Sequence, residues 1–149
     1  MQVGDLLSDD AGKSLTLPGN CPVQEAVEKM ARKSADAVVV AEDGRPVGTF
    51  SGPDLLGLFQ KQPAAQMQSV VLKEAMTDRL VVAAPEEEIR PVLARMLDGE
   101  IRHLVVLSGD MIVGHLALCD IVKKMFEILD GEIRHLNDYI ADLHEAGND

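Results

Sequence analysis

Apolar and polar positions follow two different periods along this chain, and both periods occur twice. Residues 23–30 carry apolar side chains three or four positions apart, which predicts a helix that begins near Pro22. Residues 37–41 form an apolar run that is rich in β-branched residues and too short for a helix. A turn over residues 42–45 and a second apolar run over residues 46–51 follow it, so these segments predict a β-hairpin.

The remaining elements follow from the same pattern. A short strand is predicted over residues 14–17 and a helix over residues 55–60. The second half repeats the order, with strands at 80–84, 103–107 and 111–116, a helix at 86–97, and another from Asp120 onward. Each half is therefore predicted to fold as β-α-β-β-α. The expected fold class is α/β of the α+β type, with two tandem units and a C-terminal helix.

The two halves align without a gap when residues 15–59 are shifted by 66 positions. Met30 then falls on Met96, and Asp54 falls on Asp120. Neither half can bury its apolar face well alone, so we expect the two copies to pack as a pseudo-two-fold pair. The cleft between them is the expected ligand site.

The same alignment sets the expected domain organisation. Residues 1–61 form the first repeat, residues 62–70 a linker, residues 71–130 the second repeat and residues 131–149 a helical tail. The tail carries an apolar stripe of Ile133, Leu136, Ile140 and Leu143. So short a helix needs a packing surface, which is either its own domain or a partner helix in a dimer.

Composition and charge exclude several classes of function. The net charge of −11 disfavours DNA or RNA as a partner, because nucleic-acid affinity comes from cationic side chains that neutralise phosphates. The two cysteines form no disulfide framework or zinc spacing. The N-terminus does not resemble a signal peptide, and no apolar stretch has the length of a membrane span. We therefore expect a cytoplasmic protein that acts neither in a membrane nor on nucleic acid.

The most informative string joins the second hairpin strand to the next helix. Gly48 lies within the strand, Ser51 follows at its end, and Asp54 lies three residues later. One interpretation is a helix-capping box, in which Ser51 and Asp54 satisfy the first backbone N–H groups. The other is a ligand site, because a helix N-terminus attracts anions and a carboxylate can accept hydrogen bonds from the hydroxyls of a ribose.

The second copy of this string favours the ligand interpretation. Asp120 is retained there, but Ala117 stands where Ser51 supplies a hydroxyl. Alanine is a poor N-cap residue, so capping explains Asp120 less well than it explains Asp54.

These residues resemble a known family. A tandem β-α-β-β-α repeat in which each copy closes with Gly-x-x-Ser/Thr-x-x-Asp is similar to the CBS domain pair, or Bateman module. Residues 71–77 resemble the Val-x-x-x-Met-Thr sequence that precedes many CBS repeats, and residues 3–7 resemble a weaker version of it. Residues 101–106 resemble the second strand of many repeats. The resemblance covers about residues 3–129 and suggests a free-standing, bacterial-type CBS protein.

The resemblance implies a regulatory module that binds an adenine nucleotide such as AMP, ADP or ATP between its repeats. Ser51 would then contact phosphate, Asp54 would hold ribose, and Asp120 would hold the ribose of a second, weaker site. Arg102 and His103 match the basic pair of the family and would face phosphate, and Thr16 would lie near the base. No cofactor is required for this function. The family also implies a homodimer and a protein partner whose identity is unknown.

Two alternatives remain open at the level of sequence. The first is a dimeric interaction scaffold that binds no small ligand. The second is an enzyme, but we expect none, because the sequence pairs no nucleophile with a base. We also expect no metal site, because its four histidines are scattered: His103, His115, His135 and His144.

Overall fold

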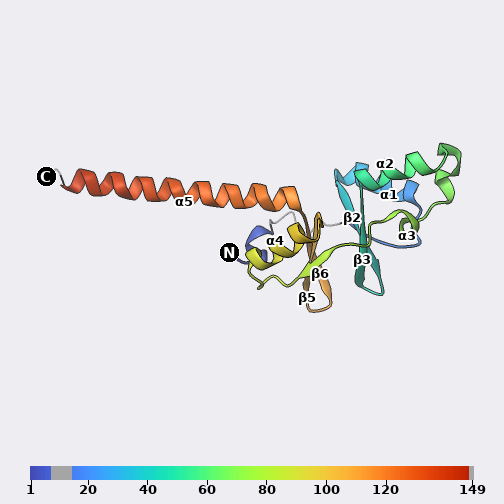
Figure 1. Ribbon diagram of the computed structural model, residues 1–149, viewed down its shortest axis with the longest axis horizontal. Helices are drawn as coiled ribbons and strands as arrows, with labels where there is room; N and C mark the ends of the chain where they lie inside the picture. Colours follow the sequence, from blue (N-terminus) through green and yellow to red (C-terminus); the bar gives the residue numbers. More distant parts are fainter. Residues whose placement is uncertain (8–14, 148–149) are drawn as a thin grey trace. The chain divides into compact units, whose positions relative to one another are not determined.

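A computed structural model describes residues 1–7 and 15–147 of the chain. The chain divides into two compact units, Met1–Ala117 and Leu118–Asp149. The first unit contains two three-stranded sheets, one from each sequence repeat. The second contains one long helix (Figure 1). The predicted α+β class, the tandem repeats and the C-terminal helix are confirmed.

The first sheet has the strand order β1-β2-β3, formed by β1 (Leu15–Pro18), β2 (Ala37–Glu42) and β3 (Arg45–Ser51). Strands β1 and β2 are parallel, because α1 (Val23–Lys33) carries the chain back between them. Strands β2 and β3 form the predicted antiparallel hairpin. Its turn places Asp43 and Gly44 at positive φ, which a glycine adopts without strain. Helix α2 (Gly52–Lys61) follows β3 directly.

The second sheet repeats this topology with β4 (Val81–Ala83), β5 (His103–Ser108) and β6 (Met111–Ala117). Helix α4 (Ile89–Asp98) connects β4 to β5 and begins three residues later than predicted. The reason is a turn in which the Ala84 N–H donates to the Glu87 carboxylate at 2.6 Å. Glu86, Glu87 and Glu88, which the sequence pattern placed in the first turn of the helix, therefore precede it.

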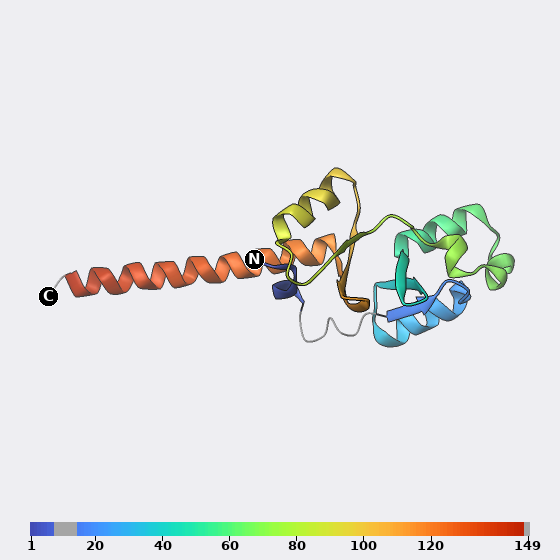
Figure 2. The same ribbon diagram turned by 90° about the horizontal axis from the view of Figure 1, so that it is seen from below.

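Each sheet has one face toward its own helices and one face toward the other repeat. Val38, Val40 and Phe50 are buried in the core of the first repeat together with apolar residues of α1 and α2. Side chains alternate along a strand, so Val39 and Thr49 lie on the opposite face. Both are almost fully buried, and β3 contacts β6 of the other repeat (Figures 1 and 2). The two repeats therefore pack through their sheets.

Two lead-in segments tie the repeats together in a reciprocal way. The first lead-in segment, residues 1–7, includes the short helix η1 (Val3–Leu6) and bonds to the second repeat. The second, residues 70–77, includes α3 (Leu72–Ala75) and bonds to the first repeat. Three backbone hydrogen bonds of the first lead-in segment have counterparts in the second. The Val3–Glu87 bond corresponds to Leu72–Cys21, Gly4–Pro85 corresponds to Lys73–Gly19, and Ile89–Met1 corresponds to Val23–Val70.

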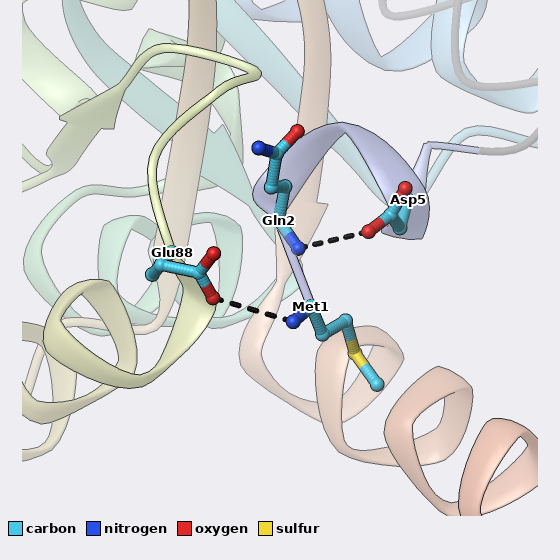
Figure 3. Close-up of polar contacts among 4 residues, drawn as sticks. All are labelled: Met1, Gln2, Asp5 and Glu88. Atoms are coloured by element: carbon cyan, nitrogen blue, oxygen red, sulfur yellow. Dashed lines mark hydrogen bonds and ion pairs between the residues drawn. The ribbon is translucent and has the colours of Figure 1, made fainter.

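The start of the chain adds polar contacts to this exchange. The Met1 ammonium group lies 3.2 Å from the Glu88 carboxylate, and the Gln2 N–H donates to the Asp5 carboxylate at 2.8 Å (Figure 3). Val3 and Leu6 are buried. Residues 1–7 thus belong to the first repeat in sequence but complete the second repeat in space.

The predicted linker and tail contain more structure than expected. Residues 62–70 include a short 3-10 helix, η3 (Ala64–Ser69), and Val70 is buried in the core of the first repeat. Helix α5 (Leu118–Gly147) runs for 30 residues and passes through Gly131 without a break. The expected start of a separate tail at residue 131 therefore lies inside a continuous helix.

Candidate functional site

The junction of β3 and α2 holds the predicted site residues in one arrangement. Ser51 is the last residue of β3 and the N-cap of α2, and Asp54 is the third residue of the helix. The Ser51 N–H donates to Asp54 Oδ2 at 2.9 Å, and the Ser51 hydroxyl lies 3.3 Å from the same oxygen. The capping interpretation is therefore correct for the structure as it stands. Capping also fixes the carboxylate at the N-terminal end of α2, where an anion would be favoured.

A residue of the second lead-in segment holds the other oxygen of Asp54. The Thr77 hydroxyl donates to Asp54 Oδ1 at 2.6 Å. The Thr77 backbone also pairs with Thr49 of β3 through two hydrogen bonds of 2.9 Å and 2.8 Å. Thr77 thus ties the second lead-in segment to the acid of the first repeat.

Gly48 is required for this approach. A Cβ at Gly48 would lie 2.6 Å from Met76 Sδ and 2.7 Å from the Thr77 carbonyl oxygen. Both separations are below van der Waals contact, so any larger residue would push the segment away from β3. The absence of a side chain at Gly48 therefore allows residues 76–77 to lie against β3.

Asp54 retains some capacity to bind a ligand. An ionised carboxylate has about four acceptor positions, and three donors of Ser51 and Thr77 already point at this one. The Ser51 hydroxyl bond is the longest of the three. If that hydroxyl turned to a phosphate, Asp54 would have about two positions free, which is what a pair of vicinal hydroxyls needs.

Two histidines of the second repeat lie near this site. His103 Nδ1 and His115 Nε2 are 3.0 Å apart, and their rings are stacked. Burial lowers the pKa of His103 below its usual value, and Arg102 lowers it further, whereas the Asp54 carboxylate raises it. The charge of Asp54 therefore reaches His103 across the two repeats. Burial and the neighbouring His103 lower the pKa of His115 to about 4.

A pocket of about 340 Å³ opens beside Ser51 on the helical side of the first repeat. Its volume is at the lower end of the range of about 300–1,000 Å³ for small-molecule sites. The lining is mostly apolar and comes from α1, from the turn before β2 and from the start of α2. Its members are Val27, Met30, Ala31, Ser34, Ala35, Asp36, Phe50, Ser51, Gly52 and Leu55.

The other predicted site residues lie at different depths. Thr16 is exposed on β1 and pairs in register with Val39, so it shares a sheet face with Thr49. Arg102 is exposed directly before β5. Asp120 is exposed at the third position of α5, after Ala117 ends β6. Its role as a second ribose contact stays a prediction.

Sequence reasoning missed Thr77 and His115 as parts of this site. Thr77 is separated from Asp54 by 23 residues, and only its place in the lead-in sequence marked it. His115 could have been found by counting across the hairpin. His103 pairs with Ala117 and Val105 with His115, so the two histidines are diagonal neighbours on one face.

Within residues 1–7 and 15–147, no three His, Cys, Asp or Glu side chains are grouped so that they could hold a metal ion. None of the helices in the same residues has the length and apolar character needed to cross a membrane.

Comparison with known sequences identifies both repeats. The CBS domain family matches residues 3–61 and 72–127. A mitochondrial CBS domain-containing protein of Arabidopsis thaliana, CBSX3, is 26% identical over 123 residues, which cover 79% of this chain and 59% of that protein. A second Arabidopsis protein, CBSCBSPB1, is 24% identical over 77% of this chain and 21% of its own length. The chain thus spans less than two thirds of either relative.

Solved structures share the fold. The CBS-domain protein ATU1752 from Agrobacterium tumefaciens has a TM-score of 0.70 and 27% identity, over 83% of this chain and 98% of that one. The CBS domain pair of protein MJ0100, solved with 5-methylthioadenosine and S-adenosyl-L-methionine, has a TM-score of 0.68 and 21% identity, over 89% and 98%. A hexameric CBS-CP12 protein from bloom-forming cyanobacteria has a TM-score of 0.68 at 21% identity, over 82% and 69%.

Proposed function

This chain belongs to the CBS domain family, and we propose that it is a regulatory module that binds an adenosine-type nucleotide at the junction of β3 and α2. The observation that carries the proposal is the convergence of Ser51, Asp54 and Thr77 at the N-terminus of α2, with His103 within electrostatic reach. The adenosine-derived ligands of the MJ0100 pair are consistent with this chemistry.

Each part of the nucleotide has a suitable group nearby. The Ser51 hydroxyl and the N–H groups at the start of α2 suit a phosphate, and Arg102 can supply positive charge in an otherwise acidic protein. His103, whose pKa is lowered by burial, can donate a hydrogen bond from a neutral ring N–H. Asp54 suits the two ribose hydroxyls. The sheet face that carries Thr16, on the side of the other repeat, suits the base, whereas the apolar pocket beside Ser51 lies on the helical side of the same sheet. Asp120 is the corresponding acid of a second site, which we expect to be weaker because Ala117 has no hydroxyl.

Thr77 offers a route from the ligand to the rest of the molecule. It binds the acid of the first repeat through its side chain and β3 through its backbone, and it leads directly into the second repeat. A nucleotide that competes with Thr77 for Asp54, or reinforces their bond, favours one position of the second lead-in segment. Regulation requires that the nucleotide bind the two positions with different affinity. A protein partner that contacts this segment would sense the difference.

The proposal is tested by calorimetry with AMP and adenosine on the native chain and on Ser51→Ala, which gives the first copy the residue of the second. We expect AMP affinity to fall about 12–160-fold, the loss for one hydrogen bond to a charged group, and adenosine affinity to change less. A thermal-shift panel of AMP, ADP, ATP and S-adenosylmethionine supports it, because a ligand at about 100 times its dissociation constant stabilises by about 2.7 kcal/mol. Absence of any shift across the panel would reject nucleotide binding.

A dimeric interaction scaffold without a small ligand is the second candidate. A row of exposed apolar side chains on α5 favours it, because such a row marks a surface for another protein. We propose that the chain forms a homodimer in either case. The scaffold predicts a dimer whose melting temperature does not respond to nucleotides.

A further inference from the structure

Helix α5 carries an apolar seam that is longer than the tail stripe. The seam members recur at alternating intervals of four and three residues, and each is between 43% and 72% exposed. They are Val122, Phe126, Leu129, Ile133, Leu136, Ile140 and Leu143. The mean spacing of 3.5 residues is the heptad period of a coiled coil, and at about 1.5 Å per residue the seam is about 32 Å long.

We propose that this seam pairs with the same seam of a second copy in a parallel, two-stranded coiled coil. The inference names the surface of the proposed homodimer and does not depend on nucleotide binding. The heptad positions support it over most of the seam, because Ile133 and Ile140 occupy position a and Leu129, Leu136 and Leu143 occupy position d, while Phe126 at a and Val122 at d begin the seam. β-branched residues at a and leucine at d favour two parallel strands.

The charges of α5 are compatible with this pairing. In a parallel pair, each g position faces the following e position of the other copy. The three facing pairs are Met125 with the partner's Asp130, Glu132 with the partner's Asn137, and Tyr139 with the partner's His144. None joins like charges. The other acidic residues of the seam region, Glu127, Asp138 and Asp142, lie at outward positions, where solvent screens them.

A second copy is the occupant that the pattern identifies. Knobs-into-holes packing requires a partner helix with the same period over the same length, and an identical helix in register meets both conditions. An unrelated helix would need an apolar seam of equal length, and a small ligand would leave most of a seam of about 32 Å uncovered.

The test uses the full chain with a cysteine at the next a position, Gly147→Cys, and with the exposed Cys119 changed to serine. Cys21 is buried and is retained. Mild oxidation at micromolar concentration should give a disulfide-linked dimer, because a parallel pair brings the two residues 147 together. Leu136→Glu should weaken the tail pairing at least about tenfold and suppress the cross-link. His135→Glu adds the same charge at an outward position and should leave the cross-link intact.

The outcomes separate this inference from the proposed homodimer. No cross-link in the parent variant, or equal cross-linking in Leu136→Glu, overturns the parallel coiled coil. An antiparallel pair or a different partner on the seam gives no cross-link and therefore counts against it. Sedimentation of the same samples reports the mass in solution. A dimer that survives without the cross-link would retain the homodimer and place its interface elsewhere.

Discussion

Asp54 combines a structural and a proposed functional role in one carboxylate. It accepts hydrogen bonds from Ser51 and Thr77, so we expect Asp54→Ala to lower the free energy of unfolding by on the order of 1–3 kcal/mol. Its loss should also weaken AMP binding by on the order of 1.5–3 kcal/mol, the range for hydrogen bonds to a charged group. Urea unfolding and calorimetry measure the two effects. Asp120→Ala is the matched control and should change AMP affinity less; equal effects of both substitutions would contradict the assignment.

The histidine pair makes stability depend on pH. The pKa of His115 is lowered to about 4 in the folded chain, mainly by burial, against about 6.5 in the unfolded chain. The unfolded chain therefore binds more protons between these values, and stability falls as the pH drops from about 6.5 toward 4. The pKa of His103, which faces Asp54, Arg102 and His115, is lowered as well, so it adds to the same trend.

Replacement of His115 should flatten this dependence. We expect the native chain to lose on the order of 2–3 kcal/mol more than His115→Gln between pH 7 and pH 4. Urea unfolding at several pH values measures the difference, and the comparison cancels the titration of carboxylates common to both proteins. Parallel pH curves for the two proteins would mean that the histidine pair does not contribute to stability.

At the scale of elements, the contact of β3 with the second lead-in segment depends on one missing side chain. Gly48→Ala would bring a Cβ against the backbone oxygen of Thr77, so we expect a loss of about 1–3 kcal/mol and weaker AMP binding. Gly114→Ala should be milder, because its Cβ meets only the flexible end of Leu7. Gly57→Ala on α2 meets no atom within 4 Å and should be neutral or stabilising. Thermal unfolding of the three variants gives the order, and a loss for Gly57→Ala as large as for Gly48→Ala would contradict it.

The sequence predicts elements well and contacts between distant elements poorly. The apolar spacing that ends at Met30 in one repeat and at Met96 in the other predicts helices α1 and α4, and the turn residues predict the hairpin of each sheet. These elements are determined by local period and by turn residues. The Ser51–Asp54 contact was also predictable, since three residues separate the partners. Thr77 reaches Asp54 only because the repeats exchange lead-in segments, which no local pattern encodes. Gly131 looked like a boundary, but α5 continues because the seam period runs through it.

At the scale of the molecule, the exchange of lead-in segments should make the two repeats unfold together. Each repeat is completed by a segment attached to the other repeat, which bonds to the residues between its first strand and its first helix, so neither repeat keeps its full set of backbone bonds if the other unfolds. Leu6 lies in the first lead-in segment and is 1% exposed, although it is distant in sequence from the second repeat it completes. A destabilising substitution at Leu6 should therefore increase the local unfolding of residues 81–117 and not only that of residues near the start of the chain.

Leu6→Ala tests this coupling. We expect a loss of about 2–5 kcal/mol, the range for a leucine truncated in a core. Hydrogen exchange should show faster opening of β4, β5 and β6, because the segment that completes their repeat is weakened. Leu56→Ala on α2 is the matched control, since Leu56 is 68% exposed and its truncation removes little buried surface. Faster exchange confined to residues 1–7, with β4 to β6 unchanged, would show that the lead-in segment frays independently and that the repeats are not coupled through it.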